Sequence, residues 1–178
     1  EMLGEKGFVA DAAFPAPDEA RFDPLSEFKE EFVRNVSEDI GQIIKVTKIA
    51  PKRLLLYSAP IWKWDVFRRA VAMASDGHLY MSGLMKALME VPEIRTYAKE
   101  LAKFAQKIVA DIPKLSKEQL AKYGLPLDEH RALLESSEFF AGEFGCQVQC
   151  HLAEDPKRYD PKDKAKNAVP LRPAIFLE

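Results

Sequence analysis

The sequence predicts an α/β (α+β) fold in which a small sheet of about three strands is covered by about six helices. Three observations support this class. Short apolar or alternating runs occur at three well-separated places in the chain, and helical periodicity fills the stretches between them. The 178 residues are 47% hydrophobic and 30% charged, which is the balance of a globular domain. No run of 18 or more apolar residues occurs, so we expect no membrane-spanning segment. Two cysteines are too few for a disulfide framework, so we expect a reducing, cytoplasmic setting and no membrane partner.

The first half of the chain begins with an irregular stretch and then alternates between helix and strand. Residues 1–23 show no sustained period, so we expect a linker or the end of another domain there. Asp23 and Pro24 suit the cap and the first position of a helix, and apolar residues at spacings of three and four extend it to about Val46. The apolar run Arg53–Ser58 lies between two prolines and predicts a buried strand.

Five more helices and two strands are expected in the remainder. The five lie at about 60–75, 81–88, 92–108, 116–123 and 126–144, and all but the second have a proline, a capping residue or a glycine at a boundary. The alternation of residues 146–152 predicts a half-buried strand, and 173–177 a last one. On the second helix Trp64 is in phase with the core stripe, whereas Trp62 lies off it and is a candidate contact for a partner.

Catalytic and metal-binding patterns are absent from the sequence. It contains no glycine-rich phosphate loop, no Gly-x-Ser-x-Gly and no His-Glu-x-x-His. Cys146 and Cys150 share one face of the expected strand, and His151 points to the other, so we interpret the cysteines as buried, reduced core residues. We therefore expect no catalytic residue, no bound metal and no cofactor, although a thiol enzyme using Cys146 or Cys150 remains an alternative.

Charge is segregated along the chain behind a net charge of −2. Residues 1–44 and 123–156 carry net charges of −7 and −6, whereas 45–122 and 157–178 carry +8 and +3. The basic residues form three groups. The first is the row Arg95, Lys99, Lys103 and Lys107; the second surrounds the first strand, with Lys45, Lys48, Lys52, Arg53, Lys63, Arg68 and Arg69; the third comprises Lys157, Arg158, Lys162, Lys164, Lys166 and Arg172.

The row from Arg95 to Lys107 has i, i+4 spacing opposite the apolar stripe of its expected helix. Like charges at this spacing repel by roughly 0.2–0.5 kcal/mol per pair, which a polyanion would offset. A plain solvated lysine face is the alternative. Together the three groups favour phosphate binding, and since no aromatic platform for single-stranded RNA is visible in the sequence, they favour contacts to backbone and shape.

Four segments, in order and at the right spacing, resemble the C-terminal domain of archaeal and eukaryotic-type leucyl-tRNA synthetases. The most specific is Ser58-Ala-Pro-Ile-Trp-Lys-Trp64 after its Arg-Leu-Leu-Leu-Tyr strand. The others are Glu1–Phe8, with Phe14-Pro15 where a tryptophan-proline is usual; Gly124–Glu129, leading through Phe139-Phe140 to Glu143 and Gly145; and Asp160–Lys166 with Pro170–Glu178. The resemblance assigns 1–23 to a linker or the end of the family's anticodon-binding helical bundle, and 24–178 to its C-terminal tRNA-binding domain.

The resemblance further implies that this chain is part of a class I ligase, which joins leucine to tRNA with ATP. The ligase's nucleotide-binding motifs and editing domain are absent here, so ATP would belong to the parent enzyme and this part would carry no active site. In the family the long variable arm of leucine tRNA is reached by the C-terminal domain. The implied partners are tRNA(Leu) and the remaining synthetase domains, not DNA. A protein-interaction module that docks onto other synthetases or translation factors is the alternative, and it would suit the acidic segments.

Overall fold

The computed structural model describes residues 23–178 of the chain. The expectation of a linker or bundle end at 1–23 therefore lies, except for Asp23, outside the described residues. The three expected strands form one mixed sheet with the order β2-β1-β3. The central strand β1 (Arg53–Ser58) pairs in parallel with β2 (Gln147–Leu152) and antiparallel with β3 (Ala174–Leu177). The predicted α/β class is confirmed.

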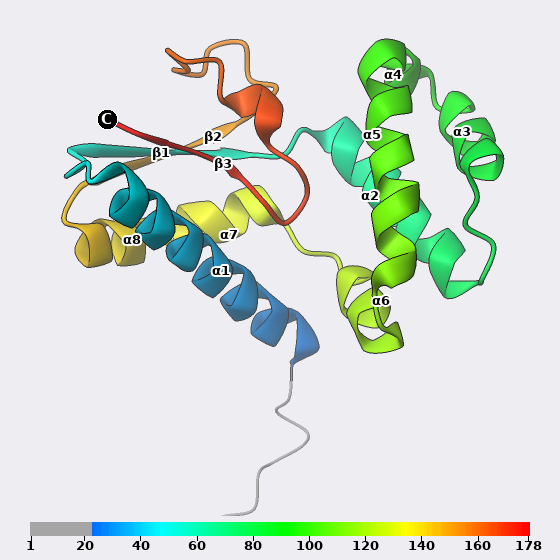
Figure 1. Cartoon of the computed structure of the whole chain (residues 1–178), viewed down its shortest axis with the longest axis horizontal. Coiled ribbons are helices and arrows are strands. Elements are labelled where there is room, and N and C mark those ends of the chain that lie inside the picture. Colours follow the sequence, from blue (N-terminus) through cyan, green and yellow to red (C-terminus); the bar gives the residue numbers. More distant parts are fainter. Residues whose placement is uncertain (1–22) are drawn as a thin grey trace, which may run out of the picture.

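Helices cover one face of this sheet, not both. Below the sheet in Figure 1 lie α1 (Pro24–Thr47), α7 (Glu129–Glu135) and α8 (Ser137–Phe144). Leu54 and Leu56 of β1 point into the main core on this side. On the opposite face Leu55 and Tyr57 are fully buried beneath the loop that contains Ala165. The expectation that helices cover the sheet is thus correct for one face, and a loop covers the other.

The remaining helices form a cluster beside the sheet. Figure 1 shows α2 leading away from β1 into this cluster, with α5 packed along it. The bounds of the helices are α2 Ile61–Ser75, α3 Met81–Met89, α4 Pro92–Arg95, α5 Ala98–Asp111 and α6 Lys117–Tyr123, with short 3-10 turns η3 (Ile112–Lys114) and η4 (Ala165–Asn167). The capping box predicted at Ser116 is confirmed, since both of its reciprocal hydrogen bonds with Gln119 are present.

Two of the six expected helices are broken, which gives eight α-helices in the described residues. The helix expected from Pro92 ends at Arg95 and restarts at Ala98. There the hydroxyl of Thr96 donates to the backbone oxygen of Glu93 at 2.8 Å and so competes with helical bonding. The helix expected at 126–144 is divided at Ser136, within a pair of serines of modest helix propensity.

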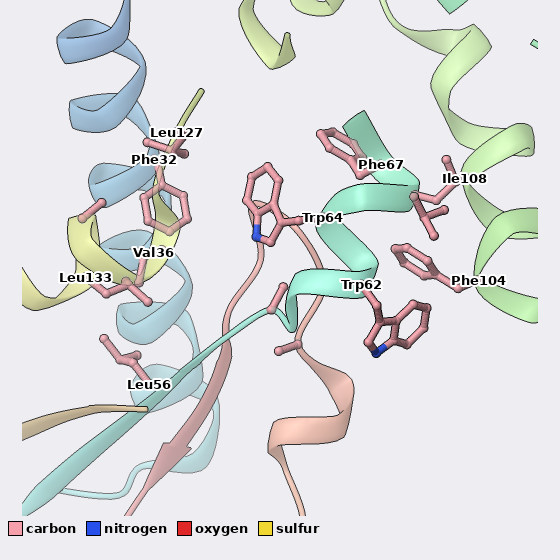
Figure 2. Close-up of a cluster of buried hydrophobic side chains, with 14 of the residues drawn as sticks. Phe32, Val36, Leu56, Trp62, Trp64, Phe67, Phe104, Ile108, Leu127 and Leu133 are labelled. Atoms are coloured by element: carbon pink, nitrogen blue, oxygen red, sulfur yellow. The ribbon is translucent and has the colours of Figure 1, made fainter. Parts of the chain in front are cut away.

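The position of Trp62 differs from the expectation. Its side chain is only 8% exposed and stacks on Tyr97, with 5.1 Å between ring centroids and 16° between ring planes. Phe104 packs edge-on against the same indole at 5.6 Å, as Figure 2 shows. The break before α5 makes this possible, because it gives Tyr97 a non-helical backbone beside Trp62. Trp62 is therefore mostly packed in the core, as Trp64 is.

Candidate nucleic-acid interface

The fold brings members of all three basic groups to one groove. This groove, of about 630 Å³, runs between α5 and the loop of residues 153–169. It is lined by five basic side chains, Lys63, Lys103, Lys107, Arg158 and Lys166, and by two acidic ones, Glu100 and Glu154. Residues that are far apart in sequence thus line one groove because the loop above the sheet faces α5 across it. We call this the α5 groove.

A second groove of about 660 Å³ continues from the first. It lies between the end of α1 and residues 164–175, and it shares Lys107, Asn167 and Val169 with the α5 groove. It adds the side chains of Lys164 and Arg172 and the acidic side chain of Asp39. The two grooves together are lined by seven basic and three acidic side chains. Such a concentration of like charge in a concave surface focuses a positive potential.

The predicted row of four cations is shorter in the structure. Arg95 belongs to α4, where its Nε donates to the backbone oxygen of Met89 at 2.6 Å, and the break at Thr96 separates it from the row. On α5 the lysines at 99, 103 and 107 are exposed. None of the three has an ion-pair partner among residues 23–178. Asp111, the nearest acid at the end of the helix, pairs instead with Lys114 at 2.8 Å.

Lys63 is held inside the protein rather than on its surface. It is 8% exposed, and its Nζ donates to the backbone oxygens of Lys166 and Ala168 at 2.9 and 2.6 Å. Burial, and then the nearby charge of Lys107, lower the pKa of Lys63. The expectation of a surface cation is corrected at this position: Lys63 ties α2 to η4 beneath the floor of the groove, and its charge adds to the field above it.

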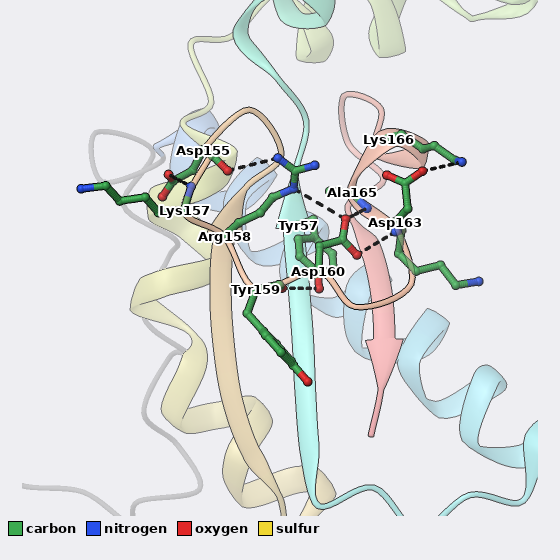
Figure 3. Close-up of polar contacts among 10 residues, drawn as sticks. Tyr57, Asp155, Lys157, Arg158, Tyr159, Asp160, Asp163, Ala165 and Lys166 are labelled. Carbon is green, nitrogen blue, oxygen red and sulfur yellow. Dashed lines mark hydrogen bonds and ion pairs between the residues drawn. The ribbon is translucent and has the colours of Figure 1, made fainter.

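The basic loop is anchored by a buried carboxylate, as Figure 3 shows. Asp160 accepts hydrogen bonds from the backbone nitrogens of Lys164 and Ala165 at 2.8 and 2.9 Å and lies 3.6 Å from Nε of Arg158. Burial acts to raise the pKa of Asp160, but these two amides and the Arg158 guanidinium outweigh it and lower the pKa. The hydroxyl of Tyr57 donates to the backbone oxygen of Tyr159 at 2.8 Å and fixes the loop to β1.

The other predicted basic residues lie away from the grooves. Lys157 and Lys162 are exposed on the loop, and Figure 3 shows Lys157 pointing away from the polar network. Arg68 and Arg69 are exposed on α2, where the guanidinium of Arg68 lies 5.1 Å from the ring centre of Trp64. Their role in binding remains a prediction. Of the residues around the first strand, Arg53 pairs with Glu178 at 2.6 Å.

Of the aromatic part of the site, the sequence indicated Trp62 as a candidate partner contact, but not Tyr97 and Phe104. Trp62, Tyr97 and Phe104 line the α5 groove together with the lysines. No local spacing reveals this set, because Trp62 comes from the start of α2 and the other two from the turn before α5 and from α5 itself. Trp62 and Phe104 are each 8% exposed, and Nζ of Lys63 lies 5.6 and 5.8 Å from their ring centroids, so the half-buried Tyr97 is the most accessible of the three rings. The expectation of backbone contacts stays a prediction.

The two cysteines pack against the helix-covered side of the sheet. Cys146 is buried just before β2, which begins at Gln147 rather than at Cys146 as expected, and Cys150 is half-buried within β2. Burial raises the pKa of Cys146 and raises that of Cys150 to about 12. His151 stacks on Tyr57 on the other face, with ring centroids 5.8 Å apart. This environment keeps the thiols protonated, which disfavours them as nucleophiles.

A serine–histidine contact occurs in the described residues, at a small pocket. The hydroxyl of Ser58 lies 3.1 Å from Nδ1 of His130, and burial lowers the pKa of His130. Ser58 is only 1% exposed, and the pocket that it lines together with His130 has a volume of about 210 Å³, below the range typical of small-ligand sites. Within residues 23–178 no group of three or more His, Cys, Asp or Glu side chains is arranged to hold a metal ion. None of the helices described is both long enough and apolar enough to cross a bilayer.

Comparison with known proteins finds leucine–tRNA ligases that are similar to the whole chain. No protein-family model matches the chain. Curated relatives match along all of it: a leucine–tRNA ligase of Methanococcoides burtonii is 42% identical over 181 residues, one of Methanothrix thermoacetophila 39% over 178, and one of Pyrococcus horikoshii 37% over 179. The chain spans less than a fifth of the length of these relatives, 19%, 18% and 17% respectively. The matched part is their C-terminal region.

Proposed function

We propose that this chain, which matches the C-terminal region of archaeal leucine–tRNA ligases from end to end, is the tRNA-binding C-terminal domain of such an enzyme. In this proposal leucine activation with ATP belongs to the other domains, and this domain works in the cytoplasm, holding RNA rather than DNA. The remaining domains of the parent enzyme are its protein partners.

The single observation that supports RNA binding is the convergence of Lys103 and Lys107 of α5 with four residues of the C-terminal basic group on two continuous grooves, above the buried Lys63. If the basic residues formed ordinary solvated surfaces, we would not expect residues so far apart in sequence to line the same grooves. Cationic side chains that replace the counterions of a phosphate backbone gain affinity without reading sequence, and this suits a domain that grips an arm of tRNA. Lys103 and Lys107 have no ion-pair partner among residues 23–178, so their charges are available to phosphates.

The finer proposal is that the bound element is the long variable arm of tRNA(Leu). Its support is the resemblance of the sequence to the family's C-terminal domain, together with the length of the basic surface, which follows α5 and then turns along residues 164–175. An A-form arm offers phosphates and 2′-hydroxyls along its shallow groove, and proteins recognise such arms largely by shape.

A binding comparison tests both levels of this proposal. The 178-residue chain is titrated with leucine tRNA, with the same tRNA lacking its variable arm, and with a tRNA that has a short arm, at several salt concentrations. We expect salt-dependent binding of the first and markedly weaker binding of the other two. Equal binding of all three RNAs would contradict recognition of the variable arm but would still support tRNA binding. No binding of any of them would contradict RNA binding by the domain.

A protein-docking function is the second candidate. Phe139 of α8 and Leu134 of α7 are 54% and 47% exposed, unlike the neighbouring Phe140 and Leu133, which are buried. Phe139 borders a groove of about 500 Å³ between α1 and α8, on the side of the sheet away from the basic loop. Exposed apolar side chains of this size favour contact with protein. If this face docks onto other domains or translation factors, Phe139→Ser weakens that association without changing tRNA binding by the isolated chain.

A further inference from the structure

We propose that the α5 groove takes one unpaired nucleotide of the RNA, with the base against the ring of Tyr97 and the phosphate at Lys103 and Lys107. This inference rests on the proposed RNA-binding function and adds to it a contact to a base. It assigns a role to the aromatic residues that phosphate binding along the surface does not use.

Of the three rings in the groove, Tyr97 is the one that offers a surface for a base, because Nζ of Lys63 lies over the rings of the buried Trp62 and Phe104. Tyr97 is half-buried and packs parallel to Trp62, and Phe104 closes the cluster edge-on. Figure 2 shows Trp62 at the edge of the cluster with its ring nitrogen turned away from Phe104. That nitrogen donates no hydrogen bond to any atom of residues 23–178, unlike that of Trp64, which donates to Glu129 at 3.1 Å. An unused indole donor beside a stacked ring pair suits a ligand that has both a π-face and acceptor atoms.

The charged side chains around the rings can contact both the phosphate and the base of a nucleotide. Lys103 and Lys107 stand one turn apart on α5, where a single phosphate can lie between them. Across the groove is Lys166, whose charge is shared with Asp163 at 2.7 Å. Glu100 and Glu154 also line the groove, and their carboxylates can accept the N–H groups on the edge of a base. Phosphate and base therefore each meet side chains of suitable chemistry within one site.

The volume of the groove, and its lining of aromatic, basic and acidic side chains, favour a single nucleotide over a duplex. Its volume of about 630 Å³ lies within the range typical of small-ligand sites. A paired base is stacked in its helix and cannot enter such a site, whereas a base in a loop or bulge can be splayed out onto an aromatic ring. An acidic peptide would satisfy the lysines but would place carboxylates beside Glu100 and Glu154.

The test compares two variants at Tyr97 and two RNAs. Tyr97→Leu keeps an apolar side chain but removes the ring, and Tyr97→Phe is the matched control that keeps the ring. The RNAs are a hairpin with an unpaired loop and a blunt duplex with the same number of phosphates. Circular dichroism and a urea midpoint for each variant establish that the chain is folded; if Tyr97→Leu is not folded, Tyr97→His replaces it as a smaller ring, with an intermediate loss expected.

We expect Tyr97→Leu to weaken hairpin binding by about 5- to 150-fold, the range of one base–aromatic contact, and to leave duplex binding unchanged. Tyr97→Phe should bind both RNAs as the unchanged chain does, and hairpin binding should quench tryptophan fluorescence. Equal hairpin affinity in the Leu and Phe variants would overturn this inference while leaving phosphate binding intact. Failure of the unchanged chain to bind either RNA would instead contradict the proposed function. Polyglutamate that displaces the hairpin and is equally sensitive to Tyr97→Leu would identify a peptide site, which also overturns the inference.

Discussion

The carboxylate of Glu129 accepts a hydrogen bond from the indole nitrogen of Trp64 at 3.1 Å, deep between the sheet and the helix cluster. The same carboxylate accepts the backbone nitrogens of Ala59 at 3.0 Å and Leu171 at 3.2 Å. One side chain thus joins α7, the junction of β1 and α2, and the segment that precedes β3. These are the parts whose relative positions create the basic grooves.

Replacing Glu129 tests this junction. Glu129 is 2% exposed, and an amide in Glu129→Gln would turn its NH₂ toward at least one of the three N–H donors. We expect the free energy of unfolding to fall by about 1–3 kcal/mol, the cost of leaving a buried donor unpaired. Urea unfolding at pH 8 measures this change. A variant as stable as the unchanged chain would show that the three hydrogen bonds contribute little.

The same residue should make stability depend on pH. Burial raises the pKa of Glu129 to about 7 from its ordinary 4.5, against the opposing effect of its three donors. Between these values the folded chain holds a proton that the unfolded chain releases, so the free energy of unfolding falls as pH rises from about 4.5 to 7 and then levels off. The size of this component is on the order of 3 kcal/mol. The difference in stability between the unchanged chain and Glu129→Gln should therefore shrink over this interval, and a constant difference would contradict it.

The lysines of the α5 groove should determine the salt dependence of RNA binding. We expect the double variant Lys103→Gln, Lys107→Gln to reduce the slope of log affinity against log salt by roughly 1, because the two lysines share one phosphate and each phosphate contact contributes about 0.9. The helix should persist, since Gln and Lys have similar helix propensity. The matched control is Lys86→Gln, Lys117→Gln, which removes the same charge from exposed positions outside the grooves. Equal slopes for the two double variants would show that the α5 lysines form an ordinary solvated face.

The anchor of the basic loop can be tested separately from its charges. Asp160→Asn keeps one oxygen acceptor but cannot accept both the Lys164 and Ala165 amides, so we expect faster hydrogen exchange at these two amides. RNA affinity should fall moderately although no lysine is changed. Asp163→Asn is the control, because Asp163 pairs only with the exposed side chain of Lys166 in the described residues. If the amides of Lys164 and Ala165 exchange at the same rate in both variants, the loop is held by contacts other than those of Asp160.

Native thiols should react slowly. With the pKa of Cys150 raised to about 12 by burial, ionisation alone should slow its alkylation at pH 8 by about a thousandfold relative to an unfolded chain with a pKa near 8.5. Cys146, whose pKa burial also raises, should be slow as well. Mass spectrometry of a timed labelling reaction, with and without urea, measures both rates. Fast labelling of either cysteine in the native chain would contradict this expectation and support the thiol-enzyme alternative.

Much of the fold follows from local patterns in the sequence. The boundaries of β1 and the starts of the first helix and the capping-box helix were predicted closely, because prolines and capping side chains act within a few residues. The divided helices were missed, since Thr96 and Ser136 break a helix only in combination with what the flanking segments pack against. Trp62 was misplaced for the same reason: its partner Tyr97 is brought to it by that break.

The site was predicted in part. The three basic groups were visible as charge in the sequence, but their convergence depends on the loop that crosses the sheet, for which no periodic signal exists. Lys63 illustrates the limit. In the sequence it is one more cation, whereas in the fold its ammonium is bound by two carbonyl oxygens beneath the groove. Tyr97, Phe104 and Glu129 were missed because their partners are remote in sequence.

The central position of β1 has a consequence for how the protein is made. Leu54 pairs with Val148 on one side and with Leu177 on the other, so neither edge of this apolar strand can be covered until most of the chain has left the ribosome. Pairing between such distant residues is slow to form and leaves intermediates prone to aggregation. The helix cluster of residues 61–123 has mostly local contacts and can collapse first. We expect nascent chains stalled before residue 147 to expose Leu54–Tyr57 and to be bound by chaperones that recognise extended apolar segments.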